Sequence, residues 1–176
     1  FYAANVDTNG IDIELSYENN TNFGLLNVGL RGTHILEYEI PGSNGSAIDV
    51  VGLFNHDNFA RSLPETKIVL NTSISNNNHT VALYGRYVSD YSTTRPLSAS
   101  AKDAGFDQKI DQWITFDLQY SYSFNLLGND IRLSIGGNNI LDEDVPIVYD
   151  AANFSYDPKH HDPRGRLFYF GLKLIR

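Results

Sequence analysis

The stretch ITFDLQYSYSF, residues 114–124, decides the fold class because an apolar or aromatic side chain occupies every second position. Threonine, aspartate, glutamine and serine fill the positions between them. An antiparallel strand has this period of two when one of its faces meets an apolar medium and the other meets water. Residues 11–17, IDIELSY, repeat the pattern. The sequence therefore predicts strands with one apolar and one polar face.

About seven such strands are expected along the chain, and no helix signal of convincing length is present. Short polar turns at 19–22, 76–79 and 125–129 alternate with long irregular loops at 39–63, 92–109 and 141–165. The predicted strands are Asn5–Glu18, Gly24–Tyr38, Glu65–Ser75, Thr80–Tyr91, Ile110–Phe124, one through Ile131–Gly136, and one from Arg166 to the terminus. Transmembrane β-barrels have tight turns at one end and long loops at the other. The predicted fold is thus all-β, an antiparallel up-and-down transmembrane β-barrel segment.

Aromatic residues are predicted at two levels of the apolar face, as in barrels whose Tyr and Trp collect where lipid tails meet headgroups. Beside the short turns are Tyr17, Tyr122 and Phe124, and beside the long loops are Tyr38, Tyr87, Phe168 and Phe170. Trp113 shares the parity of the polar side chains, so it either faces the lumen or follows a bulge. The alternative is that these aromatics form the core of a soluble β-sandwich.

The composition and motif content of the chain argue against several classes of function. The chain has 176 residues, of which 41% are hydrophobic, a net charge of -8 and no cysteine. Without a basic stripe, nucleic acid is not an expected partner. No run of eighteen apolar residues is present, so no membrane-spanning helix is expected. Because the motifs of hydrolases, metalloproteases and phosphate-binding loops are absent, we expect no enzyme and no cofactor.

Two groups of side chains resemble metal sites without predicting one. Asp142, Glu143 and Asp144 could hold a hard cation, but a solvated acidic loop is the more frequent outcome for such a run. His160 and His161 are adjacent, and neighbouring side chains of an extended segment point to opposite sides. We therefore interpret them as solvent-exposed loop histidines and assign no metal.

Two other pairs of residues have expected structural roles. Asn138 and Asn139 end a strand, and Asn tolerates a left-handed backbone, so this pair is expected to shape the strand exit. Arg164 and Arg166 flank Gly165. They could pair with the acidic loop or attract an anionic ligand, and pairing is the preferred interpretation.

The last fifty residues resemble the C-terminal end of TonB-dependent outer-membrane receptors. Residues 133–146, LSIGGNNILDEDVP, are similar to the G-x-N-N-L-F-D-E-x-P segment of that family. ANFSYDP at 152–158, HDPRGR at 161–166 and an aromatic final strand follow in the family's order. Residues 11–17, the Leu63-Pro64 pair and residues 111–124 are also similar to the family, so the resemblance extends over essentially the whole chain.

The resemblance implies a fold and a function. Such receptors form one 22-stranded barrel around an N-terminal plug. They import scarce nutrients such as ferric siderophores, cobalamin or carbohydrates across the Gram-negative outer membrane, with energy from the TonB complex. Residues 1–176 have room for about seven of those strands, without the plug or the TonB-contacting segment. We therefore expect a single partial domain, the C-terminal part of a longer receptor, with outer-membrane lipid, a small nutrient ligand and, through the missing N-terminal region, the TonB complex as partners.

Ligand contact is expected in the long loops, at polar and aromatic groups of the third one. The candidate residues are Tyr149, Asn153, Tyr156, His160 and Arg164. Two alternatives stay open: a soluble or surface-attached β-sandwich that binds carbohydrate through its loops, and a passive porin-like or assembly barrel.

Overall fold

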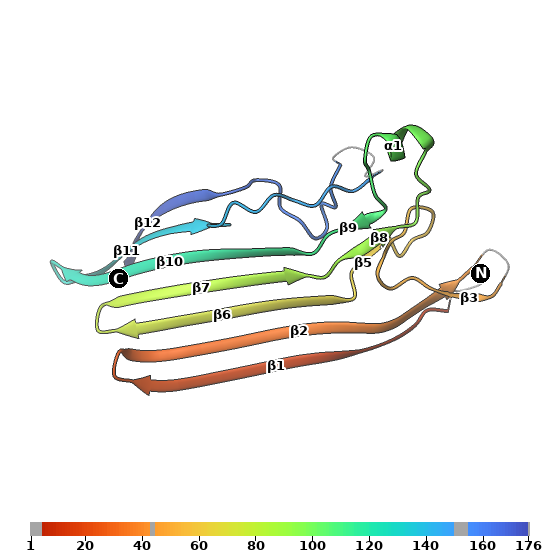
Figure 1. Cartoon of the computed structure of the whole chain (residues 1–176). Coiled ribbons are helices and arrows are strands. Elements are labelled where there is room, and N and C mark those ends of the chain that lie inside the picture. The colour runs from red at the N-terminus through yellow and green to blue at the C-terminus, as the bar shows by residue number, and fades with distance from the viewer. Residues whose placement is uncertain (1–4, 43–44, 150–154, 176) are drawn as a thin grey trace.

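The computed structural model describes residues 5–42, 45–149 and 155–175. Seven long strands form one antiparallel sheet in which spatial order follows chain order, β1-β2-β6-β7-β10-β11-β12 (Figure 1). These strands are β1 (Asp7–Thr21), β2 (Gly24–Pro41), β6 (Thr66–Asn76), β7 (His79–Val88), β10 (Trp113–Leu126), β11 (Asn129–Asn138) and β12 (Leu167–Ile175). The prediction of an all-β, up-and-down sheet is confirmed, and the strands begin and end within a few residues of the predicted limits.

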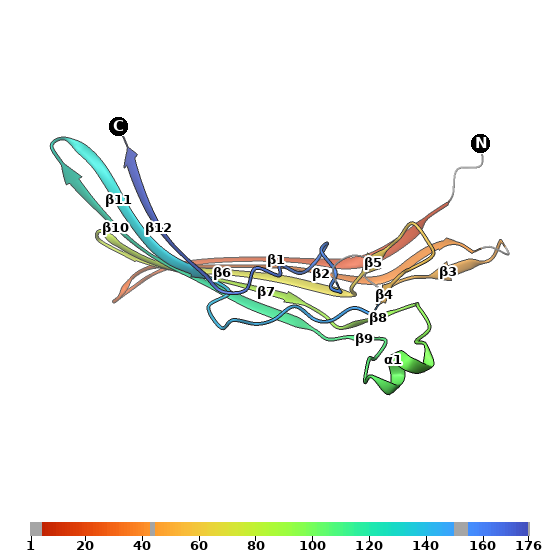
Figure 2. The ribbon, with the colours of Figure 1, turned by 90° about the horizontal axis from the view of Figure 1, so that it is seen from above.

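The short turns lie at one end of the sheet and the long connections at the other (Figure 1). In the β10–β11 turn, Leu127 and Gly128 both have positive φ, 53° and 80°. Two consecutive positive φ angles match the right-handed twist of the flanking strands, which is why two-residue turns of this kind close hairpins tightly. Figure 2 shows the twist of the sheet, with β11 and β12 crossing β1 and β2 at an angle.

One face of the sheet is apolar from the first strand to the last. Leu15 pairs with Leu30, which pairs with Leu70 on β6. At the other side, Leu133 pairs with both Tyr122 and Leu172. We call this surface the apolar face. Its large side chains with 39% to 75% exposure are Ile11, Ile13, Leu15, Tyr17, Val81, Ile114, Leu118, Tyr120, Ile135, Phe168, Phe170, Leu172 and Leu174.

The opposite face, which we call the polar face, carries side chains that bond to one another across the strands. Arg31 on β2 pairs with Glu14 on β1 at 2.8 Å. Ser121 on β10 and Ser134 on β11 are 3.0 Å apart. The Tyr169 hydroxyl on β12 donates to Gln119 Oε1 at 2.9 Å, across the width of β11. The alternation predicted from sequence therefore separates two chemically different surfaces.

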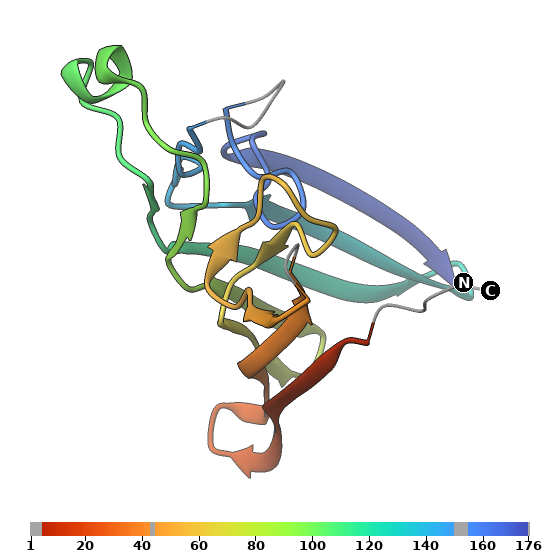
Figure 3. The ribbon, with the colours of Figure 1, turned by 90° about the vertical axis from the view of Figure 1, so that its right-hand side faces the viewer.

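The long connections contain short elements that the sequence did not indicate, because two or three residues carry no periodicity. β3 (Ala47–Asp49) pairs antiparallel with the last residues of β2. A second, four-stranded sheet has the order β5-β4-β8-β9. Its strands are β4 (Leu53–Phe54), β5 (Ser62–Leu63), β8 (Tyr91–Thr93) and β9 (Lys109–Ile110), and a short helix α1 (Ala99–Asp103) lies between the last two. Figure 3 shows these connections grouped at the loop end. Among the described residues no helix is long and apolar enough to cross a membrane.

The buried core sits where these connections fold back on the polar face. Trp113 pairs with Val88 in the register of β10 and β7, and the two pack with Tyr91, Ile110 and Val148. Trp113 is 5% exposed and shares the face of Thr115 and Asp117, with no register shift between β10 and β7. Of the two predicted placements for Trp113, the structure therefore has the one on the polar face.

The predicted aromatic placement is wrong for Tyr38. A register shift in the β1–β2 pair, at Asn9 and Gly10, leaves one extra residue on β2. One extra residue reverses the alternation beyond it. Tyr38 is thereby half-buried against a cluster of Ile40, Val50 and Ala60 instead of joining the apolar face.

Candidate ligand-binding site on the polar face

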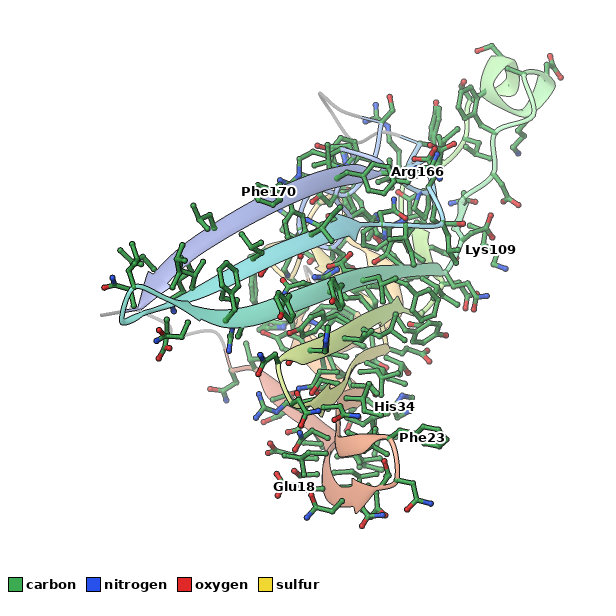
Figure 4. All side chains as sticks on the ribbon, turned by 90° about the vertical axis from the view of Figure 1, so that its left-hand side faces the viewer. Glu18, Phe23, His34, Lys109, Arg166 and Phe170 are labelled. Atoms are coloured by element: carbon green, nitrogen blue, oxygen red, sulfur yellow. The ribbon has the colours of Figure 1, made fainter. Side chains whose placement is uncertain are left out.

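A cavity of about 330 Å³ lies at the loop end of the polar face. One wall comes from β7, β10 and β11 and the other from the segment that precedes β12. The residues around it are Arg86, Trp113, Thr115, Asp117, Asn138, Asn139, Pro158, Lys159, His160, His161, Asp162, Arg164, Gly165 and Leu167. Figure 4 looks along the sheet from the turn end and labels Phe23 in the β1–β2 turn and Arg166, just before β12.

An ion pair on the strands borders the cavity. Arg86 Nη2 lies 2.7 Å from Asp117 Oδ2, and Asp117 Oδ1 accepts a hydrogen bond from the Asn139 backbone N–H at 2.9 Å. The Asp117 side chain is 13% exposed and that of Arg86 is 48% exposed. Both carboxylate oxygens of Asp117 are therefore bonded to a partner. The remaining N–H groups of the Arg86 guanidinium face the cavity.

Asn139 shapes the exit from β11, as predicted. Its φ is +46°, in the left-handed region that Asn tolerates better than most residues. Its side chain donates to the Glu143 carbonyl at 2.8 Å and accepts from the Glu143 N–H at 2.9 Å. The acidic loop is thus tied to the strand end. Arg166 pairs with Asp142 of that loop at 3.2 Å, as expected, while Arg164 pairs with its neighbour Asp162.

A buried carboxylate fixes the segment opposite the strands. Asp157, 2% exposed, accepts hydrogen bonds from the Ser62 hydroxyl, from the Tyr91 hydroxyl at 2.7 Å and from the Lys159 backbone N–H at 3.0 Å. Burial, with the Asp157 charge beside it, raises the pKa of Tyr91 well above its ordinary value. Tyr91 therefore stays a neutral donor, and the three bonds hold residues 157–161 against β5 and β8.

The interpretation of His160 and His161 as exposed loop residues is wrong. Residues 157–161 form a turn in which the backbone N–H groups of both histidines donate to the Asp157 carbonyl, at 3.3 and 3.0 Å. Because the segment is not extended, both rings reach Tyr91, with centroid distances of 6.5 and 6.2 Å. His161 is 4% exposed and also meets the Trp113 ring at 5.4 Å. Burial lowers the pKa of His161 to about 4.

Acid is expected to destabilise the loop end through His161. Its pKa falls from an ordinary 6.5 to about 4 on folding, so between these values the unfolded chain binds a proton that the folded chain does not. The free energy of unfolding is therefore fully kept above pH 6.5 and decreases as the pH falls to 4, by about 3 kcal/mol at most. Denaturant titrations between pH 4 and 7.5 test this. The His161→Phe variant should show a smaller decrease, and an equal decrease would contradict the assignment.

The cavity also gathers buried polar atoms without hydrogen-bond partners. These are Trp113 Nε1, Thr115 Oγ1 and both ring nitrogens of His161. Buried polar groups in native proteins are nearly always paired, so each exception calls for an explanation. Here all of them belong to residues that line one cavity.

The structure brings together only part of the predicted ligand-binding set. His160 and Arg164 line the cavity, and Tyr156 is half-buried outside it. Tyr149 lies instead beside α1, with its hydroxyl 3.4 Å from Ser98 Oγ and its ring 5.8 Å from that of Phe106. Asn153 lies outside the described residues. The strand residues of the cavity were not predicted, although the unusual parity of Trp113 marked this part of β10.

No metal centre is found among the described residues, since no three His, Asp or Glu side chains within them are placed to hold an ion. Comparison of the chain with protein-family models, with curated proteins and with solved structures finds no match in any of the three.

Proposed function

We propose that this chain is part of the β-barrel wall of a TonB-dependent outer-membrane receptor that imports a scarce nutrient. In this proposal the apolar face contacts lipid, the polar face lines the lumen, and the long connections carry ligand contacts at the outer end. The single observation that carries the proposal is the apolar face, which is continuous across seven antiparallel strands, half-buried on β2 and β6, and carries exposed large side chains on the other five.

The size of the apolar face favours contact with lipid over contact with water. Thirteen large side chains, each exposed by 39% to 75%, amount to on the order of 1,000 Å² of apolar surface. The largest apolar patch on an ordinary soluble monomer is about 300–600 Å². Hydrocarbon is the medium in which such a surface has no cost, and aromatic residues at both ends of the strands suit the two lipid–water boundaries.

The alternative of a soluble β-sandwich has less support. A sandwich buries the apolar faces of two sheets against each other. Here the second sheet lies toward the polar face, because its Tyr91 and Ile110 pack on Val88 and Trp113. In the described part of the chain, the outer edges of β1 and β12 pair with no strand. Hydrocarbon does not tolerate unpaired strand edges, so the proposal requires further strands on both sides, as in a larger barrel.

Site-directed spin labelling can test the proposal, and residues 1–176 have no cysteine of their own that would take up label. Single cysteines at positions 131 to 135 alternate between the two faces of β11. In outer-membrane preparations of the full protein, labels at 131, 133 and 135 should collide with oxygen, which concentrates in lipid. Labels at 132 and 134 should collide with a water-soluble nickel complex. Equal nickel accessibility at all five positions would overturn the proposal.

A further inference from the structure

The cavity beside Arg86 contains an unusual concentration of unused hydrogen-bonding capacity. Among the described residues, every buried side-chain polar atom without a partner belongs to Trp113, Thr115 or His161. All three side chains are more than nine-tenths buried, and all three line this cavity. A fold that merely packed its loops here would gain stability by replacing such groups with apolar ones. Their presence points to a ligand that pairs with them.

The unused groups are mostly hydrogen-bond donors. Trp113 Nε1 can only donate, Thr115 can donate or accept, and neutral His161 offers one donor and one acceptor. Arg86 adds the guanidinium N–H groups that Asp117 does not use. A complementary ligand is therefore rich in acceptors. The guanidinium fork fits a carboxylate better than any neutral acceptor, because two parallel N–H groups meet two oxygens.

Local charge permits an anion although the chain as a whole is acidic. Its net charge is -8. Around the cavity, however, Arg86, Lys159 and Arg164 balance Asp117, Asp162 and the buried Asp157 behind the wall. With the net charge of the wall near zero, no repulsion opposes a carboxylate, and the donors decide which ligand binds.

We propose that this cavity binds a small organic carboxylate, held by Arg86 and by the donors of Trp113, Thr115 and His161. The volume of about 330 Å³ suits a small metabolite. Because the unpaired atoms are shielded from solvent, binding has to reorient these side chains and so change the surroundings of the Trp113 ring. The inference rests on the proposed function for the biological role of the ligand, but the chemistry of the cavity does not depend on the membrane.

Trp113 is the only tryptophan among residues 1–176, so the tryptophan fluorescence of this part of the protein reports on the cavity. Succinate and succinamide are suitable probes because they have the same size and differ in charge. In the full chain, succinate should change Trp113 emission saturably, and succinamide should not at the same concentration. Arg86→Gln should weaken succinate binding at least tenfold. Arg31→Gln removes the Arg31–Glu14 pair on the same face outside the cavity and should leave binding unchanged.

Thr115→Val separates a ligand-binding role from a structural one. Valine keeps the shape and removes the unpaired hydroxyl, so the variant should unfold at a higher temperature without ligand yet bind succinate more weakly. A lower unfolding temperature with unchanged binding would overturn the inference. So would equal binding of succinamide, no binding of succinate, or full binding by Arg86→Gln. If succinate does not bind but the labels at 131, 133 and 135 are exposed to lipid, only this inference is overturned. If succinate binds as expected but all labels on β11 are equally accessible to nickel, only the proposed function is overturned.

Discussion

The Asp157→Ala variant is expected to lose roughly 3–5 kcal/mol of the free energy of unfolding. The substitution leaves the hydroxyls of Ser62 and Tyr91, 1% and 3% exposed, buried without their shared acceptor. It also releases the turn that seats both histidines against Tyr91. Equilibrium unfolding in guanidinium chloride measures this loss of stability. Trp113 fluorescence is a suitable signal, because Trp113 lies at the same loop end of the sheet.

Asp162→Ala is the matched control for Asp157→Ala, since it removes another carboxylate of the same segment. The Asp162 side chain is 47% exposed and its partner Arg164 is 65% exposed, so the control should cost less than about 1 kcal/mol. Tyr91→Phe should cost about 1 kcal/mol alone and less in the Asp157→Ala background, because both changes remove the same bond. If the losses of stability in Tyr91→Phe and Asp157→Ala were additive in the double variant, the assigned role of Asp157 would be contradicted. Equal losses of stability in Asp157→Ala and Asp162→Ala would contradict it as well.

The Ile135→Lys variant is expected to lose about 2–4 kcal/mol of stability in the membrane if the apolar face contacts lipid. Ile135 lies on the apolar face between Tyr120 and Phe170 and is 58% exposed. Lysine at this place would have to enter hydrocarbon or reach along the strand to the lipid boundary. The measurement is unfolding of the full protein from lipid vesicles by denaturant, followed by electrophoretic mobility without heating.

The size of this loss distinguishes contact with lipid from contact with water. An exposed isoleucine in water can be replaced by lysine with a change within about 0.5 kcal/mol. Asn71→Lys places the same charge on the polar face, where position 71 is exposed, and should be near neutral in either case. A neutral Ile135→Lys variant in lipid vesicles would therefore count against the lipid contact of the apolar face.

The sequence by itself determined the strands, their two faces and the short turns. These features depend on neighbours within a few residues: the period of two in 114–124 places Phe116 and Thr115 on opposite faces whatever surrounds the sheet. The exit at Asn139 was equally readable, because the backbone preference of Asn is intrinsic to that residue. A bulge is the exception, since the extra residue that redirects Tyr38 left no mark in the alternation.

Only the tertiary structure decided the site. Asp157 meets Ser62 across 95 residues and Tyr91 across 66, and no periodicity within the loop reports such contacts. The turn at 157–161 depends on those contacts. The sequence alone therefore predicts that His161 is an exposed loop residue, whereas the fold buries it. The cavity combines β7, β10 and β11 with the segment before β12 for the same reason. A strand needs only its own side chains and a neighbour, whereas a cavity between loops exists only after distant segments have packed.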